Sequence, residues 1–251
     1  KSLRVRPLES FDFAAVQLVF FAATAAVTRE YAERVRAAGC ALIDLAGALP
    51  PEQAPRIVPE VNPQVLERLA APYQLTSPSA PAVAVALVLA ALPESVRLRR
   101  ITLTACMAVS SRGREGVVEL ARQTAELLNA RPLEPRLFGR QVAFNLLAQV
   151  DDVDASGHGL LERRLADELK ELLGAPQLPV AATCVQVPVF FGDSFSVSLL
   201  AEEAIDLAAV RATLQVAAGL EYVESDDYPT VVGDAVGQDE VYVGRVRGGL
   251  G

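Results

Sequence analysis

The chain has 251 residues, enough to bury a large core in one large domain or two modest ones. Half of the residues are apolar and 22% are charged, an ordinary composition for a soluble globular protein. The net charge of −8 argues against a nucleic-acid surface, which needs a basic patch. The apolar run PAVAVALVLAAL stops at Pro93, short of the roughly 18 residues that span a bilayer, and no secretory signal opens the chain. We therefore expect no nucleic-acid partner and no membrane partner.

Alternating strand and helix patterns open the chain. Residues 16–23 form an apolar run that predicts a buried strand, and residues 27–39 show helical spacing. Thr28 is a candidate N-cap of this helix and Gly39 its terminator. A second strand is predicted over 40–47. Strand, helix and strand within about 30 residues indicate a βαβ unit and hence a parallel sheet.

The pattern changes after an apolar helix that follows SPSAP and ends near Leu92. A strand is predicted over 99–110, helices over 117–130 and 160–173, and a last strand over 241–247. The first of these two helices is amphipathic. Its predicted exposed residues are Glu119, Arg122, Gln123 and Glu126.

Residues 183–199, TCVQVPVFFGDSFSVSL, read as a strand–turn–strand unit with a tight turn at Gly192-Asp193. Apolar residues alternate with small hydroxyl residues after the turn, which predicts one apolar face and one serine-lined face headed by Asp193. The serines are Ser194, Ser196 and Ser198.

These elements predict an α/β protein of two domains. Residues 1–78 are expected to form a partial Rossmann-like parallel-sheet domain. Residues 79–251 are expected to form an α+β domain with its helices collected on one side of the sheet.

Three cysteines, Cys40, Cys106 and Cys184, suggest no disulfide framework, so a reducing cytoplasm is the expected location. All three lie in predicted strands, where a thiol is typically buried and inert. The one histidine, His158, lies in DASGHGLLERR and is interpreted as an exposed loop residue. No metal site is predicted.

Four stretches of the chain resemble aspartate-semialdehyde dehydrogenases in both order and spacing. They are IVPEVN at 57–62, VAFNLLAQV at 142–150, TCVQVPVFFGDS at 183–194 and DYPTVVGDAVGQDEVYVGRVR at 227–247. The resemblance covers nearly the whole chain and is strongest to the USG-1 branch, whose active sites are altered. It implies that the second domain is the dimerisation domain of this family.

The resemblance implies a specific chemistry. Family enzymes reduce aspartyl phosphate to an aldehyde with NADPH. A cysteine thiolate attacks the acyl carbon, a histidine handles the proton, an arginine binds the substrate carboxylate and a glutamine orients the acyl group.

This chain departs from the family at each of these positions. The cysteine of the family's Asn-Pro-Asn-Cys stretch falls on Ala80, or on Ser79 if the alignment shifts by one residue. The glutamine position is Met107, the arginine position is Gln186 and the histidine position is Asp193. Asp193 is expected to be ionised near pH 7 and a weak base.

The anion-binding positions are mixed. Arg164 lies where the family carries a lysine that binds the substrate phosphate, but the favoured interpretation is a solvated charge on the helix face. Pro50 replaces a phosphate-contacting arginine. Ala22, Ala23 and Thr24 correspond to a cofactor-lining turn, or else to an ordinary strand end. The chain begins downstream of the family's glycine-rich turn, so NADP binding is doubtful even though the resemblance implies it.

Two classes of function follow. The first is a catalytically inactive homologue that keeps the fold and dimerises. The second is an NAD(P)-dependent oxidoreductase of the same type with altered substrate or chemistry. A homodimer is expected in both cases, through an apolar sheet face that the helices leave uncovered.

Overall fold

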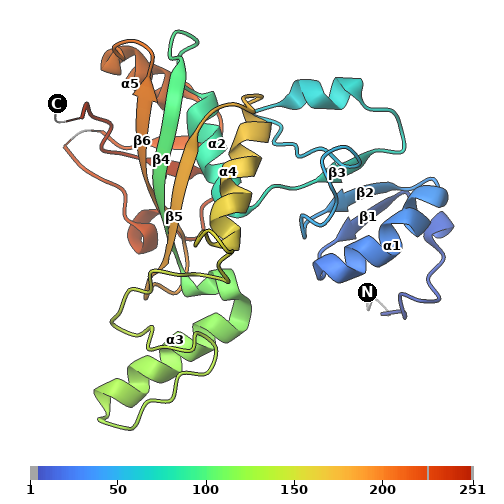
Figure 1. The fold of residues 1–251 in the computed structure, drawn as a ribbon, viewed down its shortest axis with the longest axis horizontal. Coiled ribbons are helices and arrows are strands. Elements are labelled where there is room, and N and C mark those ends of the chain that lie inside the picture. The colour runs from blue at the N-terminus through green and yellow to red at the C-terminus, as the bar shows by residue number, and fades with distance from the viewer. Residues whose placement is uncertain (1–4, 225, 250–251) are drawn as a thin grey trace. The chain divides into compact units, whose positions relative to one another are not determined.

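The computed structural model describes residues 5–224 and 226–249, which divide into two compact units, Lys1–Ser79 and Ala80–Gly251 (Figure 1). Each unit has its own β-structure and helices, which confirms the predicted α/β class. Among the described residues, no helix is long and apolar enough to cross a membrane.

The first unit is built on a three-stranded parallel sheet of order β1-β2-β3, which confirms the predicted βαβ unit. Its elements are η1 (Phe13–Ala15), β1 (Leu18–Phe21), α1 (Ala25–Ala37), β2 (Ala41–Asp44), η2 (Pro63–Arg68) and β3 (Gln74–Thr76). The short strand β3 was not predicted. β3 has only three residues, which are too few for alternation alone to indicate a strand.

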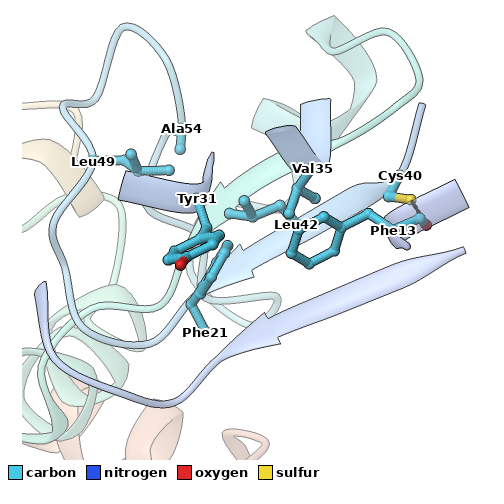
Figure 2. Close-up of a cluster of buried hydrophobic side chains, with 8 residues drawn as sticks. All are labelled: Phe13, Phe21, Tyr31, Val35, Cys40, Leu42, Leu49 and Ala54. Carbon is cyan, nitrogen blue, oxygen red and sulfur yellow. Dashed lines mark hydrogen bonds between the residues drawn. The ribbon is translucent and has the colours of Figure 1, made fainter. Parts of the chain in front are cut away.

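An aromatic-rich core fills this unit (Figure 2). It consists of Phe13, Phe21, Tyr31, Val35, Cys40, Leu42, Leu49 and Ala54. The prediction of a buried strand over 16–23 is correct only in part. Leu18 and Phe20 are exposed because they lie on the face of β1 opposite to Val19 and Phe21, which face the core, and within β1 only Phe21 is buried.

The predicted N-cap of α1 is wrong, and its predicted end is confirmed. The helix begins at Ala25 after Thr24, while Thr28 is buried inside it and donates its hydroxyl to Asp44 Oδ1 at 3.4 Å. A cap-type residue was therefore used for a tertiary hydrogen bond. Gly39 has φ of +76°, a left-handed conformation that glycine adopts without strain just beyond a helix.

The second unit contains the three-stranded sheet β5-β4-β6 and the two-stranded sheet β7-β8. Its helices are α2 (Ala80–Ala90), η3 (Val109–Arg112), α3 (Gly113–Leu128), α4 (Leu160–Leu172), α5 (Leu207–Val216) and η4 (Val231–Ala235). Its strands are β4 (Leu98–Met107), β5 (Val180–Gln186), β6 (Ser194–Ala201), β7 (Leu220–Tyr222) and β8 (Val241–Val243). Helices α2 and α4 contact each other, and α4 packs along β5 (Figure 1).

The predicted strand–turn–strand unit over 183–199 has the correct strands but the wrong pairing. β5 and β6 are not neighbours, because β4 lies between them, parallel to β5 and antiparallel to β6. The connecting segment 187–193 crosses the carboxyl end of β4. Alternation along a strand fixes which face each side chain takes, but it does not identify the neighbouring strand.

The sheet β5-β4-β6 has one covered face and one open face. On β4, Ile101, Leu103, Ala105 and Met107 are buried on the covered face. The register places the alternate residues together on the other side, which we call the hydroxyl face. Its hydroxyl residues are Thr102, Thr104, Thr183, Ser194, Ser196 and Ser198, and the same register adds Cys106, Ala181, Val185 and Leu200 to this face. Most positions of this uncovered face carry hydroxyl groups, which differs from the expected apolar face, while Leu200 on it is apolar and exposed.

Helix α3 and residues 129–147 form a projection that we call the α3 arm (Figure 1). It has a small core of Val109, Leu120, Val142, Ala143 and Leu147. The predicted exposure of Glu119 and Gln123 is wrong, since they are 5% and 0% exposed. The chain after α3 folds back over this stripe, and backbone N–H groups donate to both side chains.

Candidate functional site

Three of the substituted family positions come together at the carboxyl ends of β4 and β5. Met107 and Gln186 end the two parallel strands and are partners in the register. Asp193 lies immediately before β6, whose first residue pairs with Cys106. The carboxyl ends of parallel strands are the usual location of ligand sites in α/β folds. We therefore treat this cluster as the candidate site.

Gln186 is fully buried and held by its neighbours. Its Nε2 donates to the carbonyl of Met107 at 2.5 Å, and its backbone exchanges two hydrogen bonds with Leu147. Among the described residues, its Oε1 has no hydrogen-bond partner. The side chain carries no charge, and its one donor group binds protein, so it cannot grip a carboxylate as an arginine fork does.

Asp193 is also engaged with the backbone. Its Oδ1 accepts a hydrogen bond from the N–H of Ala108 at 2.8 Å. Burial raises the pKa of the Asp193 carboxyl above its usual value, and the hydrogen bond from Ala108 offsets this only in part.

Cys184 lies on β5, two residues before Gln186, and is buried. Burial raises the pKa of Cys184 to about 12, and the negative charges of Glu162, Asp151 and Asp193 act in the same direction. At pH 7 this thiol is therefore almost entirely protonated. The prediction that Cys184 is buried is thus confirmed.

The other two cysteines differ from each other. Cys40 is buried, as predicted, and its thiol donates to the carbonyl of Phe13 at 2.8 Å. Cys106 is only half-buried and lies on the hydroxyl face opposite Ser194. The expectation that Cys106 packs in the core is therefore wrong, because its position on β4 has the parity of the open face.

The family's cysteine position carries no sulfur. Ala80 is the first residue of α2 and is exposed, and Ser79 precedes it as the last residue of the first unit. His158 is exposed in the loop before α4, as predicted. Its backbone N–H donates to Asp154 Oδ1. This bond holds the loop and does not position the imidazole.

Arg164 lies on α4 with its Nε donating to Glu168 Oε1 at 2.8 Å. The arginine side chain is one-third exposed, and that of Glu168 is buried. Arg164 is therefore the partner of a buried carboxylate. Its guanidinium is neither a fully solvated charge nor a free cation.

The segment between β1 and α1 is open. Ala22, Ala23 and Thr24 are exposed at the carboxyl end of β1 and the N-terminal end of α1, where small residues fit the edge of a nucleotide site. Pro50 is exposed in the next loop, which Asp44 organises by accepting N–H groups of Ala46, Ala48 and Leu49. Pro50 supplies no cation.

Sequence reasoning missed Glu162. Its Oε1 accepts the N–H of Cys184 and its Oε2 accepts the N–H of Gly159, both at 2.8 Å, so it joins α4 to β5 beside the site. The signal was the spacing Gly159-x-x-Glu162 at the start of a helix, in which the N3 side chain returns to the N-cap backbone.

Comparison with protein families gives two matches that divide the chain. Residues 1–69 match the semialdehyde dehydrogenase NAD binding domain, and residues 89–250 match the semialdehyde dehydrogenase dimerisation domain. Together they confirm the architecture expected from the resemblance: a nucleotide-binding domain followed by a dimerisation domain.

Relatives and solved structures agree. The chain is 62% identical over 250 residues to a USG-1 protein homolog of Azotobacter vinelandii, covering 100% of this chain and 74% of the relative. It is 34% identical over 248 residues to aspartate-semialdehyde dehydrogenase 2 of Vibrio cholerae, covering 98% and 74%.

A structure described as a probable aspartate-semialdehyde dehydrogenase from Pseudomonas aeruginosa superposes with a TM-score of 0.96 at 59% identity, over 99% of this chain and 75% of that one. Aspartate semialdehyde dehydrogenase II from Vibrio cholerae, complexed with ASA, gives a TM-score of 0.94 at 33% identity, over 100% and 75%. The chain therefore belongs to the aspartate-semialdehyde dehydrogenase family and is a homologue of the USG-1 proteins.

Proposed function

We propose that this chain is a catalytically inactive member of its family that keeps the fold and pairs as a homodimer. The observation that carries the proposal is that, among the described residues, the family's nucleophile position carries no thiol, and Cys106 lies on the opposite face of β4 from Met107. Ala80 has no reactive group, and the Cys184 thiol is protonated because its pKa is about 12.

The charges around the site support this proposal. An acyl phosphate is an anion and needs cations to hold it. The charged groups that act on Cys184 are the carboxylates of Glu162, Asp151 and Asp193. Arg164 is paired with Glu168. We infer that a site with these charges holds the family substrate poorly.

Activity is the first test. Purified protein with aspartate semialdehyde, NADP and phosphate is expected to form NADPH at the rate of the buffer blank, because nucleophile, base, carboxylate clamp and orienting amide are all replaced. Each such role typically contributes orders of magnitude to the rate. The Vibrio cholerae aspartate-semialdehyde dehydrogenase 2 serves as the positive control. Turnover comparable with that enzyme would contradict the proposal.

Cofactor binding distinguishes this proposal from the alternative, an oxidoreductase with altered chemistry. A titration with NADPH, followed by its fluorescence, reports whether the turn at Ala22–Thr24 still contributes to a nucleotide site. Tight binding together with NADPH oxidation by another acyl phosphate or aldehyde would favour the alternative.

We further propose that residues 1–78 are the nucleotide-binding part and residues 79–251 the dimerisation part and former catalytic part, in a cytoplasmic protein. The free state of all three cysteines is in keeping with that compartment. The hydroxyl face is the proposed contact between two copies, since it is an extended open surface in the unit that matches the dimerisation domain.

Homodimer formation is tested by light scattering. The expected mass is twice 26.7 kDa at micromolar concentration. Thr102→Arg, which places a charge at the centre of the hydroxyl face, is expected to give monomers because two-fold pairing brings the two charges close together. Ala208→Arg, at an exposed position on α5, is the control and should leave the dimer intact. A wild-type mass near 26.7 kDa, independent of concentration, would show that no dimer forms.

A further inference from the structure

One peptide group at the end of β4 is held from both sides. The carbonyl of Met107 accepts the Nε2–H of Gln186 at 2.5 Å and the backbone N–H of Val187 at 3.0 Å. The N–H of the same peptide, which belongs to Ala108, donates to Asp193 Oδ1 at 2.8 Å. Met107 and Ala108 are 2% and 0% exposed, so water cannot replace these partners.

The geometry of a peptide separates the two side chains. In a trans peptide the C=O and N–H bonds point in opposite directions. Gln186 therefore holds one edge of the Met107–Ala108 peptide and Asp193 holds the other. The two side chains do not converge on a common ligand, as an arginine and a histidine acting on one substrate would.

We propose that Gln186 and Asp193 are positioning residues that form a two-sided clamp on the Met107–Ala108 peptide and fix the point at which the α3 arm leaves the sheet. The inference deepens the proposed function and rests on it, since these side chains are free for this task only if they do not act on a substrate.

The residue types suit the clamp. The N–H edge requires an acceptor, and an ionised carboxylate is acceptor-only. The carbonyl edge requires a donor, and burying a neutral amide costs less than burying a charged guanidinium, even though Gln186 Oε1 has no partner among the described residues. Replacement of histidine by aspartate and of arginine by glutamine thus matches what the two edges of the peptide need.

The clamp also continues into the next segment. Beyond the peptide, the N–H of Val109 donates to Val189 at 2.9 Å and the N–H of Ser110 donates to Phe190 at 3.1 Å. These bonds join the start of η3 to the segment that carries Asp193. Removing part of the clamp should therefore raise amide exchange first at Ala108, then at Val109 and Ser110, and only later at the centre of β4.

Amide hydrogen exchange measured by NMR on the full chain tests the clamp. The quantity is the exchange rate of Ala108 relative to Leu103 at the centre of β4, which removes any global loss of stability. Asp193→Ala is expected to raise this ratio about five- to ten-fold, the size of one lost hydrogen bond. Asp193→Asn keeps an oxygen acceptor and should restore a ratio close to wild type. Ser194→Ala, one residue along, is the control and should leave the ratio unchanged.

The second edge is tested by Gln186→Met, which keeps the length of the side chain and removes its donor. It should also raise the Ala108 ratio, and the double variant with Asp193→Ala should raise it by less than the product of the single effects, because both residues hold one peptide. Multiplicative effects, or an Asp193→Ala ratio equal to that of Ser194→Ala, would overturn the clamp. Enzymatic turnover with these exchange results intact would instead overturn the proposed function alone.

Discussion

Gln123→Leu is expected to lower the free energy of unfolding by about 3 kcal/mol and to release the segment that covers α3. The Oε1 of Gln123 accepts the N–H groups of Val142 at 2.8 Å and Ala143 at 3.2 Å, and its Nε2 donates to Glu119 at 2.8 Å. Leucine has a similar volume, so the packing is largely kept. Two buried N–H groups are left without acceptors, and each costs about 1 to 3 kcal/mol.

Urea unfolding and limited proteolysis together measure this effect. The variant should unfold at lower urea concentration and should be cleaved between residues 131 and 147 under conditions that leave the wild type intact. Gln177→Leu, at an exposed position in the same unit, controls for the loss of an amide side chain. Equal stability of Gln123→Leu and Gln177→Leu would show that the arm does not depend on this residue.

Gly192→Ala is expected to cost about 2 to 4 kcal/mol, because left-handed backbone and steric overlap act together. Gly192 has φ of +85°, and a Cβ there would lie 2.4 Å from Cγ1 of Val231 and 3.1 Å from Cγ2 of Val236. Since the next residue is Asp193, the substitution should also displace the carboxylate from Ala108.

A matched control separates the two contributions. Gly237 has φ of +86°, and a methyl group added there would have no atom of another described residue, its chain neighbours aside, within 4 Å, so Gly237→Ala reports the backbone strain alone. Thermal unfolding should show a larger loss for Gly192→Ala than for Gly237→Ala. Adding Val231→Ala to Gly192→Ala should recover part of the difference by removing the overlapping methyl group. Equal losses for the two glycine variants would mean that the turn has room to adjust.

The fold was predictable where local patterns decide it. Helical spacing located α1 and α4, and the left-handed Gly39 ended α1 as expected. The sequence could not reveal that β4 separates β5 from β6, because alternation specifies faces and leaves the neighbour open. The sequence analysis also predicted that Glu119 and Gln123 are exposed. The pattern of polar residues is the same whether water or a loop folding back over the helix provides their hydrogen-bond partners.

The candidate site was predictable in its residues and not in their contacts. The order of the motifs identified Met107, Gln186 and Asp193, which the structure brings to one end of the sheet. Nothing local indicated that Asp193 would bind the N–H of Ala108, 85 residues earlier in the chain. A long-range contact of this kind depends on how the strands are ordered, and that order was the part of the fold that the pattern left undecided.

The hydroxyl face has a consequence for how its surface can change in evolution. A hydroxyl group rotates about its C–O bond and serves as donor or acceptor, so Thr102, Thr104, Ser196 and Ser198 can reverse the direction of a hydrogen bond without moving their backbones. Bridging water can fill a gap between two such surfaces at little enthalpic cost. A surface built in this way tolerates small shifts of whatever lies against it, where interlocking aliphatic side chains would demand that both sides change together.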